Sequence, residues 1–557
     1  MIPFPEYPRP QFERKDGWEI LNGEWDLKVL SKEGETLKEG KILVPYSPEA
    51  PKSGFGHITQ PSETLEYRRH VSLSFPFSPE SERLFLHFGA VDYEAEVYID
   101  GEKRISHRGG YLPFSLEVFS SSFDILVKVT DPTDEGEEER GKQKIKRGGI
   151  WYTPQSGIWQ TVWIEKTPKD YVKSIRMIPD LKGFSFLTET SREGEGEITV
   201  DGKTYSFSSS VPLRIDISYP RLWSPEDPYL YPVSITFGAD RISSYTALRT
   251  FGTSKDKEGR ERLFLNGKPY FHHGLLDQGY WEEGLYTPPS DKAMEDDIKL
   301  AKDMGFNTLR KHIKVESLRW YYHCDRIGIL VWQDAVSGGG NYFFPIISAP
   351  LIFGSHLKDN HYFLLRRRDK DKRREFEENL MAMVDHLMNV VSIAMWVPFN
   401  EAWGQFDSVR IGKMVEEKDP TRTVDYASGW LDQGEGKFLS QHVYFRPYSF
   451  RPDKKGRCVI LSEFGGYGRE IKGHRWGNDT FQYKGFKTEE ELTSALVKLY
   501  ENEIIPAKKK GLSASIYTQL SDVEDELNGL VTYDRKVVKM DRDRIRALSE
   551  KLLKDVE

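Results

Sequence analysis

The sequence predicts a multidomain protein built from a β-sandwich of jelly-roll type, a smaller immunoglobulin-like β-sandwich and a (β/α)8 (TIM) barrel. Its 557 residues are too many for one hydrophobic core, and chains of this length usually form several domains. Short strand patterns broken by Gly, Pro and Asp fill the first part, and strand patterns alternate with helix patterns beyond Gly252. We therefore expect domains at 1–165, 166–253 and 254–557.

The first domain is expected to contain strands only. Candidate strands are Leu84–Phe88, Ala95–Ile99 and Phe123–Val129, and Asp100-Gly101 is a hairpin signal after the second of them. No convincing helix pattern interrupts these strands, which favours a jelly-roll sandwich. The segment Thr133–Arg147 is rich in acidic and then in basic residues, so we expect a solvated loop there.

The second domain continues with short strands, such as Glu197–Val200. A part of about 90 residues with this pattern fits a small immunoglobulin-like sandwich.

The third domain alternates strands and helices. Ser290 is a candidate N-cap of a helix that ends at Gly305, with apolar residues at helical spacing (Met294, Ile298, Ala301 and Met304). A second helix is expected from Leu318 to Cys324, ending near Gly328. The candidate strands are Phe271–Leu276, Asn307–Leu309, Ile329–Trp332, Ile393–Val397, Thr423–Tyr426, Gln441–Phe445, Val459–Ser462 and Ser515–Gln519. This alternation predicts a (β/α)8 barrel with its active site at the carboxyl ends of the strands.

Two of these barrel strands end in a glutamate. The apolar run Ile393–Phe399 stops at Asn400 and Glu401, and Val459–Ser462 is followed at once by Glu463. Because the carboxyl ends of all the strands face the barrel mouth, we expect the two carboxylates to face one pocket. A proton donor and a second carboxylate are the groups that cleave a glycosidic bond, and the Asn400 amide can hydrogen-bond a sugar hydroxyl.

The connection after the third barrel strand is unusually long. Val336–Lys372 exceeds the usual length of a βα loop. Because such loops border the mouth of the barrel, we expect a lid over the substrate there.

The composition excludes several classes of protein. A net charge of −8 offers no electrostatic footprint for nucleic acid or for an anionic membrane. No apolar run is long enough to span a membrane, and Met1–Pro5 shows no signal-peptide pattern, so we expect a cytoplasmic protein. The only cysteines, Cys324 and Cys458, lie in apolar patterns and are expected to be reduced core residues. The sequence leaves open whether the protein forms a homo-oligomer.

Short motifs spread along nearly the whole chain point to a known family. They are Gly23–Trp25, Phe88–Asp92, Gly109–Phe114, Ser156–Gln160 and Leu265–Pro269. Together with the two glutamates on strands four and seven, they make the chain resemble glycoside hydrolase family 2, the β-galactosidase, β-glucuronidase and β-mannosidase group. The resemblance implies that Glu401 is the acid/base, Glu463 the nucleophile and Tyr444 a residue that orients the nucleophile.

The resemblance implies further site residues. Arg310 matches a family arginine near the nucleophile, and Lys311 and His312 follow it. His442 sits where relatives often carry Asn, and Trp476 is in place for a hydrophobic sugar platform. The candidate substrate-binding residues are therefore Asn400, Tyr444, His442, Arg310, Lys311, His312, Trp476, Trp403 and Asp334.

Departures from the family pattern bear on metal and substrate. The third strand ends in Gln333-Asp334, and the histidine that helps hold magnesium in long bacterial β-galactosidases is absent, so we expect no metal and no cofactor. The Asn-x-Lys motif common in β-glucuronidases is missing from Trp476–Thr480. We therefore expect a retaining exo-β-glycosidase that acts on a β-galactoside, with a β-glucuronide, β-mannoside or arabinoside as alternatives. A carbohydrate-binding protein that has lost catalysis is the competing class.

Overall fold

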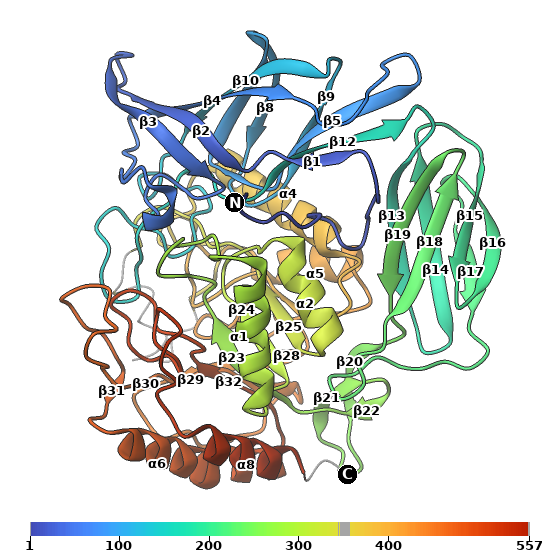
Figure 1. The fold of residues 1–557 in the computed structure, drawn as a ribbon. Coiled ribbons are helices and arrows are strands. Elements are labelled where there is room, and N and C mark those ends of the chain that lie inside the picture. The colour runs from blue at the N-terminus through green and yellow to red at the C-terminus, as the bar shows by residue number, and fades with distance from the viewer. Residues whose placement is uncertain (1, 343–344, 346–356, 555–557) are drawn as a thin grey trace.

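The computed structural model describes residues 2–342, 345 and 357–554. Figure 1 shows the N-terminal sandwich above the barrel and the smaller sandwich at its side, so the expected combination of folds is confirmed. Among the helices that the structure describes, none is both long and apolar enough to cross a membrane.

The N-terminal part is a sandwich of two antiparallel sheets around its own apolar core. The four-stranded sheet has the order β1 (Trp18–Ile20), β12 (Val162–Pro168), β5 (Glu82–Phe88) and β9 (Phe114–Val118). The six-stranded sheet has the order β3 (Thr36–Val44), β2 (Gly23–Leu30), β4 (Thr64–Ser72), β10 (Ser122–Thr130), β7 (Glu94–Ile99) and β8 (Glu102–Arg108). A short pair, β6 (Val91–Asp92) and β11 (Gly157–Ile158), and a 3-10 turn, η1 (Pro51–Ser53), complete it. The expected bound at 165 falls inside β12, because that strand pairs with β5 as far as Pro168.

The second part is a smaller sandwich with a separate core. Its sheets have the orders β13 (Val172–Pro179), β14 (Gly183–Thr190), β17 (Leu213–Asp216), and β16 (Lys203–Ser208), β15 (Glu195–Val200), β18 (Tyr231–Phe237), β19 (Asp240–Thr246). A small sheet of β20 (Phe251–Lys255), β21 (Glu261–Leu265) and β22 (Lys268–Pro269) leads to the barrel. The expected bound at 253 falls inside β20, which pairs with β21 and therefore belongs to this connecting sheet.

All eight predicted barrel strands are confirmed, in one parallel sheet. They are β23 (His272–Asp277), β24 (Thr308–Lys311), β25 (Leu330–Asp334), β26 (Ile393–Val397), β27 (Thr423–Val424), β28 (Phe438–Val443), β29 (Cys458–Gly465) and β32 (Leu512–Thr518). Neighbours pair from β27 back to β23 and on through β32 and β29 to β28. In the described part of the chain no backbone ladder joins β27 to β28, but Ser428 Oγ lies 3.2 Å from Ser440 Oγ across that gap. The barrel is thus closed there by side chains.

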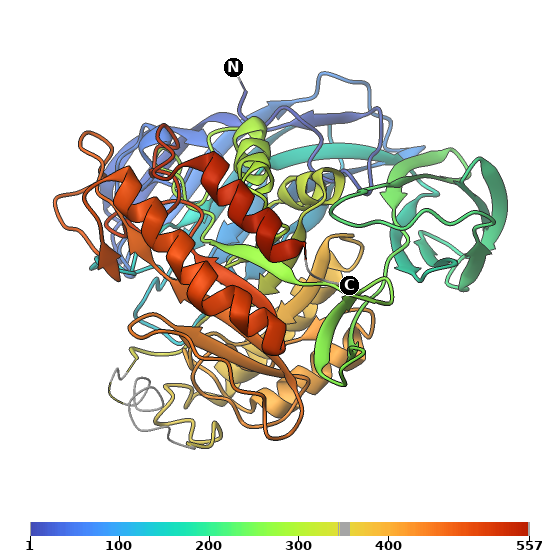
Figure 2. The same cartoon turned by 90° about the horizontal axis from the view of Figure 1, so that it is seen from below.

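Helices cover the outside of the barrel. They are α1 (Asp291–Asp303), α2 (Leu318–Ile327), α4 (Lys370–Leu387), α5 (Ser408–Lys418), α6 (Glu489–Leu499), α7 (Ile505–Lys510) and α8 (Arg542–Leu553). A π-helical turn, η2 (Tyr500–Ile504), follows α6, and a short strand pair is formed by β30 (Tyr467–Gly468) and β31 (Lys484–Gly485). As predicted, Ser290 caps α1 by accepting a hydrogen bond from the Ala293 amide, and Gly328 ends α2 with a φ of 83°. Figure 2 shows α6 and α8 side by side across the barrel. Cys324 and Cys458 are buried free thiols, also as predicted.

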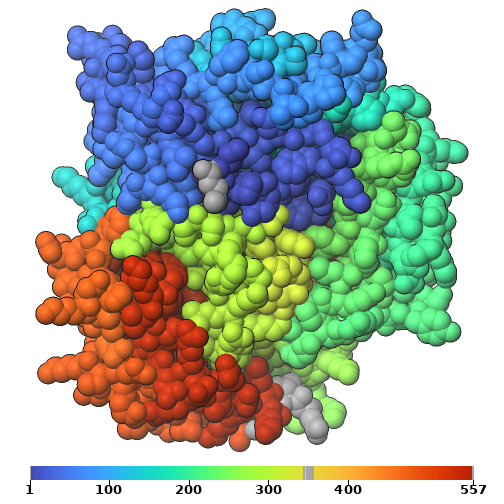
Figure 3. Space-filling view, viewed as in Figure 1, coloured from blue at the N-terminus to red at the C-terminus, as the bar shows by residue number. Residues whose placement is uncertain are grey.

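The jelly-roll part and the barrel are packed into one unit, which Figure 3 shows as a continuous contact between blue and yellow-green atoms. Tyr111, Tyr152 and Trp159 of the N-terminal part belong to the same apolar core as the barrel. The prediction of a solvated loop at Thr133–Arg147 is wrong for 139–143, which are buried against the barrel, whereas Lys146 and Arg147 are exposed. The predicted lid at 336–372 lies partly outside the described residues, so it stays a prediction.

Candidate active site

Both glutamates lie at the mouth of the barrel, held by fixed backbone. Glu463 is part of β29, which is buried throughout. Glu401 follows β26 in a tight turn in which Glu401 and Ala402 have φ values of 49° and 61°. The Glu401 amide donates to the Ser428 carbonyl at 2.9 Å, which holds this turn. Left-handed backbone at non-glycine residues costs free energy and occurs mainly where the surrounding structure enforces it, often at functional sites.

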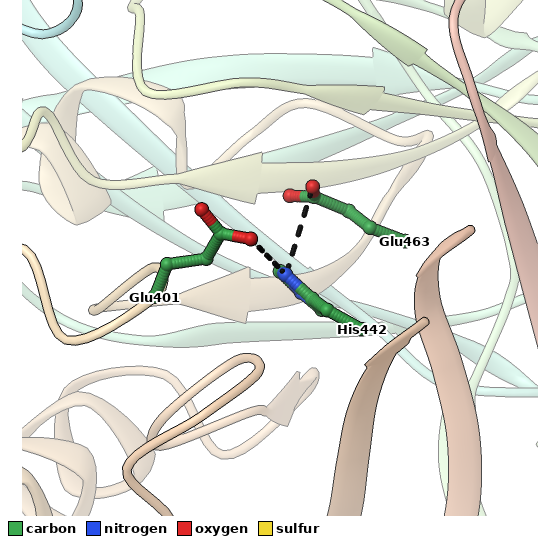
Figure 4. Close-up of side chains that lie close together, drawn as sticks. All are labelled: Glu401, His442 and Glu463. Atoms are coloured by element: carbon green, nitrogen blue, oxygen red, sulfur yellow. Dashed lines mark hydrogen bonds and ion pairs between the residues drawn. The ribbon is translucent and has the colours of Figure 1, made fainter. Parts of the chain in front are cut away.

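The His442 ring lies between the two carboxylates (Figure 4). Its Nδ1 atom is 2.8 Å from Glu401 Oε1 and 3.6 Å from Glu463 Oε2. One carboxylate oxygen of each glutamate and a ring nitrogen of His442 all lie within 4.8 Å of one another. Carboxylate oxygens this close favour a retaining glycosidase, whose carboxyl groups stand about 5–5.5 Å apart, over an inverting one, whose groups are ~6.5–9.5 Å apart.

Arg310 is the central cation of the site and is fully buried. Its guanidinium donates to Glu463 Oε1 at 3.2 Å, to Asn400 Oδ1 at 2.8 Å and to Asp334 Oδ1 at 3.0 Å. The Tyr444 hydroxyl donates a short hydrogen bond to the other oxygen of Glu463. Glu463 is therefore fixed on both oxygens by donors that favour its ionised form.

The same surroundings separate the acidities of the two glutamates. Burial and the negative charge of Glu463 raise the pKa of Glu401. Burial also opposes ionisation of Glu463, but the charges of His442 and Arg310 outweigh it and lower the pKa of Glu463 to about 2. One carboxyl group is thus suited to donate a proton while its neighbour is an anion.

An aromatic wall flanks the carboxylate pair. The Trp403 ring centroid is 5.3 Å from that of Trp151 and 6.2 Å from that of Tyr342. Next to Glu463, the Tyr483 ring stacks at 4.0 Å on Tyr444, whose hydroxyl binds that carboxylate. Aromatic faces of this kind suit the apolar faces of a sugar ring.

A sequence-family comparison identifies the barrel. The model described as the TIM barrel domain of glycosyl hydrolases family 2 matches residues 259–544, just over half of the chain, and a second model of glycosyl hydrolases family 2 matches residues 174–252. The chain belongs to glycoside hydrolase family 2.

Individual members of family 2 are only distantly similar to this chain. A β-galactosidase of Thermoanaerobacter pseudethanolicus is 23% identical over 65% of this chain and 48% of its own length. A β-glucuronidase of Bacteroides fragilis is 24% identical over 77% of this chain and 63% of its own length. The chain thus spans about half to two thirds of these relatives. A solved family 2 β-galacturonidase of Eisenbergiella tayi, bound to galacturonate, has the same fold, with a TM-score of 0.70, 18% identity and coverage of 98% of this chain and 99% of its own.

Most of the predicted site residues gather around the pair in this family 2 barrel. Asn400 contributes its Oδ1 atom to Arg310, whereas its Nδ2 atom is buried without a partner among the described residues and is thus a donor available to a sugar hydroxyl. Asp334 is a supporting residue, because it binds both Arg310 and the His312 Nδ1 atom (2.9 Å). His312 lies 3.9 Å from Glu463 Oε1.

Two predicted residues lie elsewhere and are removed from the candidate site. Lys311 Nζ pairs with Asp277 at 2.7 Å and lies 4.1 Å above the Trp320 ring of α2, so this side chain points outward from the barrel. The alternation of side chains along β24 explains this, since Arg310 takes the inward position. Trp476 packs on Tyr533 at 5.6 Å and on a cluster at the jelly-roll contact, and no ring contact or hydrogen bond in the described part of the chain joins it to the pair.

Several residues of the site were not predicted from the sequence. Tyr483 and Trp151 lie in irregular segments without a periodic pattern, and only the fold brings them to the pair. Lys142 reaches the Trp403 ring from the N-terminal part. In the sequence, the glycine between the basic residues of Arg140–Gln143 is the feature that could have drawn attention to Lys142.

Glu401, His442 and Glu463 each offer an atom that could hold a metal ion. The His442 Nδ1 atom already hydrogen-bonds Glu401, and Arg310 and Tyr444 occupy the oxygens of Glu463. A divalent ion would have to displace these donors. The hydrogen bonds that these three side chains already make therefore fit a metal-free carboxylate pair.

Proposed function

We propose that this protein is a retaining exo-β-glycosidase that removes a terminal sugar by double displacement. The observation that carries the proposal is the close carboxylate pair around His442, with oxygens within 4.8 Å, in which Glu463 has a lowered and Glu401 a raised pKa. Family 2 membership supports glycosidase chemistry.

In the first step Glu463 attacks the anomeric carbon while Glu401 gives its proton to the leaving oxygen. The glycosidic C–O bond breaks, and the sugar becomes an ester of Glu463. In the second step Glu401, now a carboxylate, takes a proton from water, and the water oxygen displaces Glu463 from the anomeric carbon. Arg310 and Tyr444 hold the nucleophile in one orientation throughout.

The identity of the sugar is a separate proposal. The sequence favours a β-galactoside, and relatives named β-galactosidase and β-glucuronidase support both classes at 23% and 24% identity. Terminal β-galactosides and β-glucuronides are therefore the first substrates to test, followed by β-mannosides and arabinosides.

A panel of nitrophenyl glycosides tests the activity, and NMR of the first sugar released tests the stereochemistry. We expect hydrolysis of at least one β-glycoside with the β-configuration in the initial product. An initial α-product would contradict the assignment of Glu463 as nucleophile. Binding of sugars without hydrolysis of any member of the panel would favour the competing class, a carbohydrate-binding protein.

A further inference from the structure

Lys142 is brought to the active site by the N-terminal part of the chain. The amides of Arg140 and Gly141 both donate to the Ser337 carbonyl, at 3.0 and 2.9 Å, beyond the end of β25. Gly141 has a φ of +62°, and a Cβ atom there would lie 2.9 Å from the Tyr286 hydroxyl. The backbone before Lys142 is therefore fixed tightly against the mouth of the barrel.

The Lys142 ammonium faces the wall beside the carboxylate pair. The side chain is buried, with 5% of its surface exposed. Its Nζ atom lies 5.7 Å from the Trp403 ring centroid and 5.6 Å from that of Tyr152. Burial is the main cause that raises the pKa of Glu401, and the positive charge of Lys142 opposes that rise. The charge of Lys142 therefore acts on Glu401, the proposed proton donor.

Unlike the buried Lys311, Lys314 and Lys539, Lys142 has no anionic partner in the part of the chain that the structure describes. Lys311, Lys314 and Lys539 each have a carboxylate oxygen within 2.7 Å. For Lys142 no hydrogen-bond acceptor or carboxylate is found within the described ranges 2–342, 345 and 357–554, and only the two rings contact its charge. A buried ammonium without an acceptor is unfavourable, and aromatic faces compensate only part of that cost. An anion supplied by a ligand would complete this site.

We propose that Lys142 binds a carboxylate on the terminal sugar, so that the enzyme prefers β-uronides to neutral β-glycosides of the same configuration. The proposal rests on the proposed glycosidase function and names its substrate class. Arg310 does not supply this recognition, because Glu463, Asp334 and Asn400 already occupy its guanidinium.

The test uses matched substrates that differ at one position. Nitrophenyl β-glucuronide is compared with β-glucoside, and β-galacturonide with β-galactoside, with the β-mannoside completing the panel. We expect the wild-type enzyme to prefer a uronide, and Lys142→Met to lower the uronide-to-neutral ratio of kcat/KM by roughly 10- to 100-fold, mainly through KM. Lys142→Arg should retain most of the ratio. Lys146→Met, which removes the same charge from an exposed position of the same segment, should leave the ratio unchanged.

The outcomes separate the two proposals. If the wild type cleaves no member of the panel, the glycosidase function itself fails. If it cleaves neutral glycosides as well as the uronides, or if Lys142→Met lowers both members of a pair equally, the role of Lys142 is overturned and the glycosidase assignment stands. If Lys142→Met does not fold, inhibition of the wild-type enzyme by free sugars tests the role of Lys142 instead. Free glucuronate and galacturonate should then inhibit more strongly than glucose and galactose, and equal inhibition would overturn the proposal.

Discussion

Glu401 and Glu463 have the same side chain but opposite pKa shifts, and their neighbours explain the difference. Glu463 receives donors on both oxygens, from Arg310 at 3.2 Å and from Tyr444. Glu401 receives one bond, from His442, and faces the negative charge of Glu463. Since charged donors favour the anion and burial disfavours it, the two pKa values move apart.

The first prediction follows from this separation. Activity needs Glu463 ionised and Glu401 protonated, so kcat/KM should rise as pH passes the pKa of Glu463, about 2, and fall as it passes the raised pKa of Glu401. In Glu401→Ala the limb at higher pH should disappear. Steady-state rates across the pH range measure both limbs, and an unchanged high-pH limb in Glu401→Ala would assign it to another group.

The same variant should respond to azide. Without a proton donor, sugar leaving groups should react much more slowly than dinitrophenol, which needs little protonation. The glycosyl-enzyme then accumulates for want of a base, and azide, which needs no deprotonation, should restore turnover and give a β-glycosyl azide. Glu463→Gln is the control, because it loses the nucleophile and should show no such azide product. Equal loss with both kinds of leaving group would withdraw the acid/base role from Glu401.

At the scale of elements, the barrel strands were predictable because strand patterns alternate with helix patterns beyond Gly252, and β26 and β29 contain continuous apolar runs. Asn400 and Glu401 follow β26, and Glu463 lies near the carboxyl end of β29, so the breaks in these two apolar runs indicated their place at the barrel mouth. The direction of a side chain at a strand end could not be predicted, and Lys311 shows this, since one step along β24 separates the inward from the outward face. The wall residues Trp151 and Tyr483 come from irregular segments, whose path depends on packing between domains.

The turn after β29 supports the nucleophile through close packing. Gly466 has a φ of +68°, and a Cβ atom there would lie 2.3 Å from the Tyr483 ring. Tyr483 stacks on Tyr444, which binds Glu463. The orientation of the nucleophile therefore depends on the absence of a side chain at Gly466.

We expect Gly466→Ala to displace Tyr483 and lower kcat by about tenfold, a barrier change of about 1.4 kcal/mol. Gly473→Ala is the matched control, because Gly473 also has a positive φ, +86°, but has open space around its Cβ position. Both variants should lose about 1–2 kcal/mol of stability from backbone strain, and only Gly466→Ala should lose kcat. Thermal melts and steady-state kinetics measure the two effects. Equal kcat values would show that Tyr483 does not support the nucleophile.

At the scale of the whole molecule, the active site is shared between domains. Lys142, Trp151 and Tyr152 come from the N-terminal part, and the Tyr152 hydroxyl donates a short hydrogen bond to Glu526 in the loop after β32. Arg147 pairs with Asp525 at 2.7 Å in the same contact. The jelly-roll part therefore contributes side chains beside Trp403 at the barrel mouth, which the domain order in the sequence alone could not reveal.

The shared core predicts how the molecule unfolds. Trp159 of the N-terminal part is 2% exposed, belongs to the core of the barrel and donates to the Gly110 carbonyl at 2.8 Å. The jelly-roll sheets also have a core of their own, but Tyr111, Tyr152 and Trp159 pack into the core of the barrel, so we expect activity and amide protection of the jelly-roll strands to be lost in one urea transition. The smaller sandwich has a core of its own, which contains Phe186, so its protection can be lost separately.

Two truncations distinguish these cores. Trp159→Ala should lower the stability of jelly roll and barrel together by about 3–5 kcal/mol, seen as equal shifts of activity and of jelly-roll amide protection in urea. Phe186→Ala creates a cavity of similar kind in the smaller sandwich and should shift the amide protection of β14 and β18 first. Hydrogen exchange resolved by peptide, together with residual activity, measures each part. A contrary result would be a Trp159→Ala variant that keeps its activity at urea concentrations where the jelly-roll amides exchange freely. The jelly roll and the barrel would then unfold independently. The segment that carries Lys142 would in that case pack against the barrel without belonging to its cooperative core.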